Sequence, residues 1–552
     1  MTNKEIARTF QFLGQIMELH GENPYKIRSY QNAYMTLRKL DHPLEEMSDD
    51  EISQIKGVGK AISGKIRELL DTGEMQTLER YKSETPKGVQ EMLAIKGFGP
   101  KKIRVIWKDL GAESIGELLY AVNENRLIEL KGFGEKTQED LRKKLQYYQR
   151  TKNQFHYATL EAEAQQILEY ISEQLPEARL SLTGATRRRC NTLESIDILI
   201  GYNGSLEPLF EKEILRRTGG DGNYITAETE SELPLRLFPC NPGDFGSKLF
   251  RTTGAEPFLE AFIKAYPDVD FRHLVDEHTV FEKAALPYIA PELREQEWAL
   301  DLARTGKLPE LVEEQDVRGI LHAHTTYSDG IGSLEAMATY TRDQGFAYLG
   351  ITDHSKSAFY ANGLSPERVR RQFEEINRLN AELAPFRIFK GIESDILNDG
   401  SLDYEEDLLA EFDFIIASVH SNLRMDEEKA TRRLITAIEN PYTSILGHPT
   451  GRLLLSREGY PIDHQRVIDA CAANGVAIEI NANPYRLDLD WTWIPYALEK
   501  GVLIAINPDA HSLEGIHDIH YGVLSARKGG LTAEQCLNHF STEEFAKWCA
   551  GG

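Results

Sequence analysis

The sequence predicts a multidomain protein with a helical N-terminal region, an α/β middle region and a C-terminal barrel of alternating strands and helices. Three observations support this fold class. A glycine motif recurs three times in residues 1–150, strand-like runs begin after residue 152, and seven further apolar runs follow residue 318 with helical sequence between most of them. At 552 residues the chain is too long for one hydrophobic core, and about three domains is the ordinary expectation.

The composition predicts a cytoplasmic protein that keeps its thiols reduced. Five cysteines are scattered without CxxC spacing, which argues against a disulfide framework. The N-terminus lacks a basic segment followed by an apolar one, and no run approaches the roughly 18 apolar residues of a membrane span. We therefore expect a cytoplasmic, nucleoid-associated monomer with no membrane partner.

The net charge of −24 is distributed unevenly along the chain. Residues 1–150 contain 25 Lys and Arg against 23 Asp and Glu, so the acidic excess lies in the rest of the chain. For nucleic-acid binding the distribution of charge matters more than its total. The N-terminal region is therefore compatible with DNA binding, and multivalent cations would offset part of the acidity elsewhere.

The repeated N-terminal motif is apolar-Lys-Gly-apolar-Gly, found as IKGVGK (55–60), IKGFGP (95–100) and LKGFGE (130–135). Glycine permits positive φ and close backbone approach, and the helix that follows presents its free amides across the turn. The motif resembles the helix-hairpin-helix module, which holds DNA phosphates through backbone amides without reading sequence. Ordinary glycine-capped helix turns are the alternative. The predicted DNA-contacting glycines are Gly57, Gly59, Gly97, Gly99, Gly132 and Gly134.

Residues 4–70 also resemble the N-terminal lyase domain of family X DNA polymerases, through ENPYKIRSYQNAY and IKGVGKAISGKIRELLDTGEM. In members with lyase activity, a lysine after the first hairpin forms a Schiff base with an abasic sugar, and Lys65 occupies the matching place. Such a lysine must lose its proton, which requires burial or neighbouring cations such as Lys60 and Arg67. A solvated lysine is the alternative.

The middle region resembles a family X palm that has lost its acids. ARLSLTG (178–184) and SIDILIG (195–201) read as strands. The family motif places three carboxylates around two Mg²⁺ ions. Here Ser195 stands at the first position, Asp197 remains at the second and Pro234 occupies the third. Serine and proline are poor substitutes for Mg²⁺-binding carboxylates, so we predict a structural palm that does not polymerise.

Two further features of this region bear on DNA contact. Ala185 stands where the family has a nucleotide-contacting serine. Three consecutive arginines, Arg187, Arg188 and Arg189, are either contacts for DNA phosphates or a solvated basic face.

The C-terminal apolar runs end in polar side chains. GILHAHTTYSDG (319–330) contains two histidines one residue apart, which point to the same side of an extended backbone. Six of the seven runs close on a metal-capable residue, and a closed barrel places its chemistry at the C-terminal ends of its strands. The candidate ligands at these ends are His322, His324, Asp329, His354, Glu393, His420, His448, Asp509 and His511.

HAHTTYSDG, TDHS, GIE, SVH, GHP, NANPYRLDLD and PDAH resemble, in the same order, the signatures of the polymerase-and-histidinol-phosphatase (PHP) domain over residues 316–552. The resemblance implies a distorted (β/α)7 barrel with three divalent cations, Mn²⁺ being favoured and Zn²⁺ or Fe compatible. It implies one site of His322, His324, Glu393 and Asp509, a second of Glu393, His420 and His448, and a third of Asp329, His354 and His511.

A cluster of cations favours phosphoester hydrolysis because it polarises phosphate and activates water. Glu393 is the predicted bridging catalytic residue, Arg486 and Lys356 are candidates to hold the substrate phosphate or are rim ion-pair residues, and Asp353 is expected to orient a neighbour. The main hypothesis is a DNA-repair enzyme that trims gapped, nicked or free 3′ ends, with 3′-to-5′ direction implied by the family, and that can also cleave abasic sites. The alternatives are an active DNA polymerase, a small-molecule phosphatase and a non-enzymatic DNA-end scaffold.

The sequence patterns predict five parts. They are a lyase-like helical domain (1–80), a fingers-like helix-hairpin-helix domain (81–152), a degenerate nucleotidyltransferase palm (153–240), a thumb and linker (241–312) and a PHP metallophosphoesterase domain (313–552).

Overall fold

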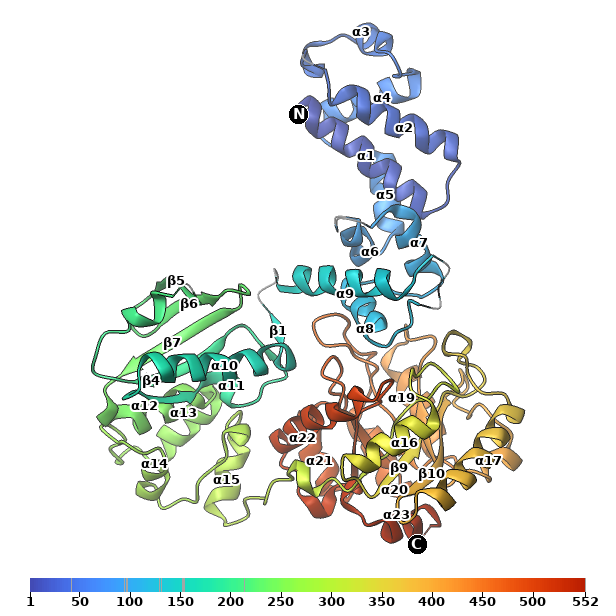
Figure 1. Ribbon diagram of the computed structural model, residues 1–552. Helices are drawn as coiled ribbons and strands as arrows, with labels where there is room; N and C mark the ends of the chain where they lie inside the picture. The colour runs from blue at the N-terminus through green and yellow to red at the C-terminus, as the bar shows by residue number, and fades with distance from the viewer. Residues whose placement is uncertain are drawn as a thin grey trace. The chain divides into compact units, whose positions relative to one another are not determined.

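The computed structural model describes residues 1–40, 42–93, 95, 98–128, 130, 132–150, 154–212 and 214–551, and for residues 146–150 the backbone alone. The chain forms two compact units, Met1–Tyr148 and Gln149–Gly552 (Figure 1). Among the described helices, none combines the length and the apolar character that crossing a membrane requires.

The first unit consists of helices joined by short turns. Three helices begin with a capping box, in which Thr2, Ser48 or Ser114 accepts from the backbone N–H three residues later and the glutamate at that position accepts from the cap. Stacked Phe10 and Tyr30 hold the first two helices together with ring centroids 6.0 Å apart. The helices are α1 (Asn3–Leu19), α2 (Pro24–Leu37), α3 (Asp49–Gln54), α4 (Lys60–Thr72), α5 (Gln76–Glu84), α6 (Lys87–Met92), α7 (Pro100–Lys108), α8 (Ile115–Asn123) and α9 (Glu135–Arg150).

The three glycine motifs share one backbone hydrogen bond between their described residues. In each, the N–H of the second apolar residue donates to the carbonyl of the first. The pairs are Val58 to Ile55 at 2.9 Å, Phe98 to Ile95 at 3.1 Å and Phe133 to Leu130 at 3.0 Å. The motifs therefore lie between α3 and α4, α6 and α7, and α8 and α9, with this hydrogen bond in common.

Glycine is required in the first and third motifs for its backbone conformation. Gly57 and Gly132 have φ of +88° and +95°, in the left-handed region. Gly59 and Gly99 are the N-caps of α4 and α7, and neither cap supplies a side-chain hydrogen bond. Gly134 directly precedes α9. The first amides of α4 and α7 are thus left without a side-chain cap, while Gly97 lies outside the described residues.

The second unit begins with a five-stranded mixed sheet of order β2-β4-β7-β6-β5, and with a small pair of β1 and β3. β4 and β7 run parallel, which brings Asp197 opposite Arg236. The predicted strands at 178–184 and 195–201 correspond to β2 and β4. The strands are β1 (Phe155–His156), β2 (Arg179–Leu182), β3 (Thr192–Leu193), β4 (Ile196–Gly201), β5 (Leu215–Gly220), β6 (Ile225–Thr229) and β7 (Pro234–Cys240).

Helices flank this sheet and continue into a region with an aromatic core. Phe250 lies at the centre of that core, with ring centroids 4.8 Å from Phe262 and 5.6 Å from Phe281. The helices of this part are α10 (Tyr157–Gln174), α11 (Gly184–Arg187), α12 (Phe245–Thr253), α13 (Glu256–Ala265), α14 (His278–Lys283) and α15 (Trp298–Arg304).

The C-terminal part is a seven-stranded parallel sheet that curls into a barrel, as predicted. Its order, β14-β13-β12-β11-β10-β9-β8, is the reverse of the chain order. The barrel is closed by backbone hydrogen bonds between the segments that follow β8 and β14. His324 N–H donates to Ala510 O at 2.8 Å, and Ala510 N–H donates to His322 O at 3.2 Å. The strands are β8 (Gly319–Ile320), β9 (Tyr348–Ile351), β10 (Arg387–Asp395), β11 (Phe414–Ser418), β12 (Ile445–Leu446), β13 (Ala477–Asn481) and β14 (Ile504–Asn507).

Helices cover the outside of the barrel (Figure 1). The predicted helices at 366–383 and 463–474 correspond to α17 and α20, and the Asp463 side chain caps the latter. The helices are α16 (Leu334–Asp343), α17 (Pro366–Glu382), α18 (Glu406–Leu409), α19 (Glu427–Ile438), α20 (His464–Asn474), α21 (Ile494–Glu499), α22 (Ile519–Lys528) and α23 (Thr542–Cys549).

Within the second unit, the basic triplet is paired internally rather than forming a solvated face. Each arginine meets a different glutamate: Arg187 with Glu277 at 2.7 Å, Arg188 with Glu295 at 3.0 Å and Arg189 with Glu161 at 3.3 Å. Helix α22 of the barrel joins the same network. Lys528 Nζ lies 2.6 Å from Glu295 and donates to Arg188 O at 2.8 Å, while His520 Nε2 lies 3.0 Å from Glu161. The triplet therefore ties the mixed-sheet region to the barrel.

This network predicts a pH-dependent contribution to stability. The contact with Glu161 raises the pKa of His520 to about 8 from an ordinary 6.5; burial opposes the shift and Glu314 adds to it. The stabilisation is thus complete below pH 6.5 and lost as the pH rises through about 8. We expect His520→Gln to lower the thermal unfolding midpoint by about 1–3 °C at pH 6 and to have little effect at pH 9.

The control for this measurement is His517→Gln in the preceding turn, which should show no such difference between the two pH values. An equal effect of His520→Gln at pH 6 and pH 9 would contradict the role of the protonated imidazole.

Candidate metal centre

The nine side chains predicted as ligands lie at one end of the barrel. His322 and His324 follow the short strand β8, whereas Glu393 lies inside β10. The side chains of all nine are between 0 and 11% exposed. Closure of the barrel between Ala323 and Ala510 is what brings the first histidine pair beside Asp509.

Glu393 lies at the centre of the cluster. Its carboxylate oxygens lie 2.9 Å from His354 Nδ1, 3.1 Å from His420 Nε2 and 3.1 Å from His448 Nε2. The Nε2 atoms of His322 and His324 are slightly farther away, at 3.6 and 3.7 Å. One carboxylate therefore faces five imidazoles from four different segments of the chain.

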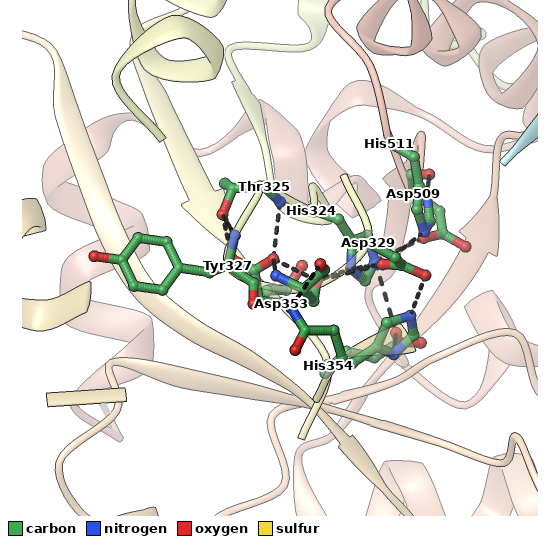
Figure 2. Close-up of polar contacts among 12 residues, drawn as sticks. His324, Thr325, Tyr327, Asp329, Asp353, His354, Asp509 and His511 are labelled. Atoms are coloured by element: carbon green, nitrogen blue, oxygen red, sulfur yellow. Dashed lines mark hydrogen bonds and ion pairs between the residues drawn. The ribbon is translucent and has the colours of Figure 1, made fainter. Parts of the chain in front are cut away.

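Two further carboxylates complete the cluster. Asp509 Oδ1 lies 2.9 Å from His324 Nε2 and 3.4 Å from His322 Nε2. Asp329 lies 3.6 Å from His354 Nε2 and 3.4 Å from His511 Nε2. Figure 2 shows His324, His354 and His511 converging on these two aspartates.

The donor atoms fit divalent cations. Two ligands at about 2.1 Å from one ion and at tetrahedral angles lie roughly 3.4 Å apart, and the N···O distances of 2.9–3.8 Å bracket that value. Among the nine predicted ligands, all within the described residues, five have a buried atom that makes no hydrogen bond: His322 Nε2, Asp329 Oδ2, His354 Nδ1, Glu393 Oε2 and His448 Nδ1. Because buried polar atoms are normally satisfied, atoms of this kind are available to bind an ion.

Three compact groups of donors can be distinguished. They differ in detail from the ligand sets implied by the family resemblance, since His324 also approaches the third group and His354 approaches the group around Glu393. The groups are His324, Asp329, His354 and His511; His322, His324 and Asp509; and His354, Glu393 and His420.

The carboxylates of the cluster are held in their ionised form. Burial favours a raised pKa for Glu393, but the imidazoles, His420 first among them, hold that pKa well below its usual range. The pKa of Asp509 is likewise lowered well below its usual value, with His322 outweighing burial. Both acids are therefore charged at neutral pH, which is the form that binds a cation.

The histidines differ from one another. Burial and the neighbouring His511 lower the pKa of His324 to about 4, so its ring is neutral at pH 7. The pKa of His420 is raised to about 10, because Glu393 and Asp395 outweigh burial. His420 is therefore protonated at neutral pH in the metal-free protein, and a cation that binds there must displace this proton.

Two outer carboxylates orient these histidines, and neither was singled out from the sequence. Glu479 lies 2.7 Å from His322 Nδ1 and accepts from Asn507 at 2.9 Å. Asp395 lies 2.6 Å from His420 Nδ1. Both contacts leave the Nε2 atom free to face the cluster. The available signal was an acidic residue inside an apolar strand: Glu479 within β13, and Asp395 two residues after Glu393 on β10.

Asp353 holds the loop that carries Asp329, in agreement with the expected orienting role. Its carboxylate accepts from the backbone N–H and the hydroxyl of Thr325 at 2.8 and 2.7 Å and from those of Ser328 at 3.1 and 2.5 Å (Figure 2). Gln372 of α17 donates a fifth hydrogen bond at 2.6 Å. This carboxylate is therefore occupied by the loop and is not placed to bind an ion.

The two predicted phosphate-binding residues have different surroundings. Lys356 is exposed, with Nζ 5.6 Å from the centre of the Tyr404 ring. Arg486 is only 7% exposed. Its backbone carbonyl accepts a hydrogen bond from Arg452 Nε at 3.0 Å. The loop before Arg486 also touches the mixed-sheet region, because the Tyr485 ring packs 4.5 Å from the ring of His156.

The residual acid of the mixed sheet is fully occupied by protein groups. Arg236 Nε and Nη2 donate to the two oxygens of Asp197 at 2.7 and 2.6 Å, and the Ser195 hydroxyl donates to Oδ1 at 2.7 Å. Gly184 has φ of +59°, and a Cβ on it would lie 2.2 Å from Asp197 Oδ2. Asp197 is 2% exposed and compensated by a guanidinium, so its carboxylate needs no metal.

Lys65 lies on α4 with its ammonium group half-buried. Its Nζ donates to Thr77 Oγ1 at 2.5 Å. Burial lowers its pKa, and the cations that add to this effect are Lys26 and Arg80. The expected neighbour Arg67 is instead paired with Asp49 at 2.6 Å.

Comparison with protein families gives three matches along the chain. Residues 1–75 match a helix-hairpin-helix domain, residues 89–146 match a SAM-like helix-hairpin-helix tandem, and residues 321–483 match the PHP domain. The predicted helix-hairpin-helix region and PHP domain are thereby confirmed.

Individual relatives cover the chain to different extents. The DNA polymerase/3′-5′ exonuclease PolX of Bacillus subtilis is 34% identical over 566 residues, which cover 99% of this chain and 98% of the relative. A probable phosphatase of Thermoanaerobacter sp. is 30% identical over 222 residues, covering 36% of this chain and 88% of the relative. A probable phosphatase of Acetivibrio thermocellus is 28% identical over 199 residues, covering 34% of this chain and 78% of the relative.

Proposed function

Because the chain belongs to the bacterial family X DNA polymerases with a C-terminal PHP domain, we propose that it is a DNA-repair hydrolase whose PHP centre cleaves phosphodiesters at 3′ ends, and also at abasic sites. The observation that carries the proposal is the buried cluster centred on Glu393. In this proposal residues 313–552 form the hydrolytic domain, and the glycine turns of residues 1–152 hold the backbone of gapped or nicked DNA. The protein acts as a cytoplasmic, nucleoid-associated monomer.

The donor set suits three divalent cations, with Mn²⁺ favoured and Zn²⁺ or Fe compatible. The residues that would hold them are His322, His324, Asp329, His354, Glu393, His420, His448, Asp509 and His511. Bound cations would polarise the phosphate and activate water for attack on phosphorus.

Protein groups perform the remaining tasks. Glu479 and Asp395 fix the ring orientations of His322 and His420, so that Nε2 of each faces the cluster. The exposed Lys356 reaches a substrate phosphate from the rim, and Arg486 holds the phosphate from the turn between β13 and α21. Positioning of this kind lowers the barrier by fixing the phosphodiester before attack.

The mixed sheet contributes no polymerase chemistry in this proposal. Two hard dications require several carboxylate oxygens, and Asp197 is the single acid left at the family positions. Its charge is compensated by Arg236 at 2.6–2.7 Å. The region acts as a support that joins the helix-hairpin-helix modules to the hydrolytic domain.

The nuclease assignment predicts a near-complete loss of activity on Glu393→Ala. Removing the carboxylate that faces five imidazoles should lower digestion of end-labelled single-stranded, gapped and abasic DNA with Mn²⁺ by about a thousandfold or more. Chelation should abolish the activity of the wild type, and Mn²⁺ should restore it.

The matched control is Glu382→Ala, a half-exposed glutamate of α17 outside the cluster, which should digest DNA at the wild-type rate. Unchanged digestion by Glu393→Ala would reject the site. Faster turnover of histidinol phosphate than of DNA would instead support the phosphatase function suggested by the probable phosphatases among the relatives.

The degenerate palm predicts no primer extension. With Mg²⁺ or Mn²⁺, a gapped template and all four nucleotides, we expect no incorporation above the level of the Asp197→Ala variant. The same variant should retain wild-type digestion of DNA, because Asp197 belongs to the mixed sheet and not to the barrel. Robust incorporation that Asp197→Ala abolishes would show that this palm polymerises.

A second activity, abasic-site lyase chemistry, is favoured by the environment of Lys65. Burial lowers the pKa of Lys65, which increases the fraction of nucleophilic amine at neutral pH. Borohydride should trap wild type on abasic DNA, and Lys65→Ala should lower the cross-linked fraction about tenfold or more. The exposed Lys4→Ala on α1 is the control and should cross-link normally. Equal trapping of Lys65→Ala would assign the Schiff base to another amine.

A further inference from the structure

The loop that follows the ligand His354 carries aromatic side chains at its tip. Residues 355–364 leave the barrel and return, with Ser355 bridged to Leu364 and the Leu364 N–H donating to His354 O at 2.8 Å. Within the loop, Ala358 and Ala361 are completely buried. The short helix between them, η6 (Phe359–Ala361), is therefore anchored on both sides.

Further contacts fix this loop against the neighbouring one that bears Asp329. Asn362 donates to the backbone carbonyls of Tyr327 and Ser328, each at 3.3 Å. Arg368 of α17 donates to Asn362 O at 2.8 Å and also to Tyr327 O. The two loops thus form one packed unit at the rim of the metal centre.

Although the loop is anchored, Phe359 projects into solvent with 88% of its surface exposed. Next to it, the centroid of the Tyr360 ring lies 6.2 Å from that of the His354 ring, with an angle of 63° between the ring planes. Tyr360, the sequence neighbour of Phe359, is therefore next to the predicted metal ligand His354.

Isolated exposed apolar side chains are ordinary on protein surfaces, so their distribution carries the argument. Among the described residues of the barrel, four large apolar side chains are exposed: Ile331, Phe359, Tyr360 and Leu455. Each lies two to seven residues after a predicted ligand in the sequence. The exposed apolar surface of the barrel is thus concentrated on the loops at its metal end.

We propose that Phe359 is a stacking platform for the unpaired nucleobase of the nucleotide whose phosphodiester reaches the metal centre. This inference rests on the proposed nuclease function and deepens it, because it assigns a binding residue to the base of the nucleotide that is removed. When the phosphate of a nucleotide lies among the predicted metal ligands, its base is separated from that phosphate by one sugar. The base then lies at the rim of the metal centre. A protein partner would require a far larger apolar patch, whereas one aromatic face suffices for a base of any sequence.

Binding tests this inference without catalysis. The probe is an oligonucleotide with 2-aminopurine at its 3′ terminus, whose fluorescence is quenched on stacking, mixed with the metal-free full-length protein. Wild type and Phe359→Trp should quench the probe, whereas Phe359→Ala and Phe359→Leu should bind about tenfold more weakly or not quench. Ile263→Ala, a 53% exposed apolar residue of α13, is the matched control. Quenching by Phe359→Ala equal to that of wild type overturns the proposal.

A double-mutant cycle, which combines the Phe359→Ala substitution with removal of the terminal base, tests the same contact during digestion. Phe359→Ala should lower kcat/KM about tenfold on an oligonucleotide with a 3′-terminal base, and much less when the terminal nucleotide is an abasic analogue. An equal loss on both ends would make Phe359 a structural residue and overturn the inference. If wild type digests neither oligonucleotide with Mn²⁺, the nuclease proposal fails, and the quenching experiment alone decides whether the base stacks on Phe359.

Discussion

The arrangement of side chains at the metal end of the barrel depends on one constraint. The negative charge of the buried Glu393 carboxylate must be compensated by neighbouring groups. A carboxylate at 1% exposure is stable only beside positive charge or hydrogen-bond donors, and here five imidazoles from four segments supply the surroundings. Those segments follow strands close to β10 in the sheet. Closure of the barrel through Ala323 and Ala510 then adds Asp509 and His511 to the same cluster, so closure of the sheet completes the site.

The mixed sheet meets the same constraint differently. Asp197 is as deeply buried as the acids of the barrel, yet its compensating charge is the guanidinium of Arg236, directly opposite on the parallel strand. A guanidinium makes two fixed hydrogen bonds and leaves no open coordination position. The carboxylate of Asp197 is thus fully hydrogen-bonded by protein groups. The barrel cluster instead contains buried ligand atoms that make no hydrogen bond.

The parallel barrel and its strand ends could be predicted because apolar runs alternate with helical sequence and end in metal-capable residues. The glycine turns could be predicted because positive φ at Gly57 and Gly132 leaves a local signature. Contacts between distant segments could not, because no periodicity encodes them. The pairing of Glu479 with His322 spans 157 residues, and the pairing of Arg188 with Glu295 joins separate elements.

The arginine triplet shows most clearly what composition leaves open. Three adjacent cations suggest a surface for phosphates, but whether they face solvent depends on which acids the fold brings near them. In the folded chain Glu277, Glu295 and Glu161 occupy all three, and Lys528 of the barrel shares one of these partners. Breaking such half-buried pairs would leave uncompensated charges between the mixed-sheet region and the barrel. Because Lys528 and His520 of α22 share Glu295 and Glu161 with Arg188 and Arg189, the triplet joins the mixed-sheet region to the barrel instead of presenting a phosphate-binding surface.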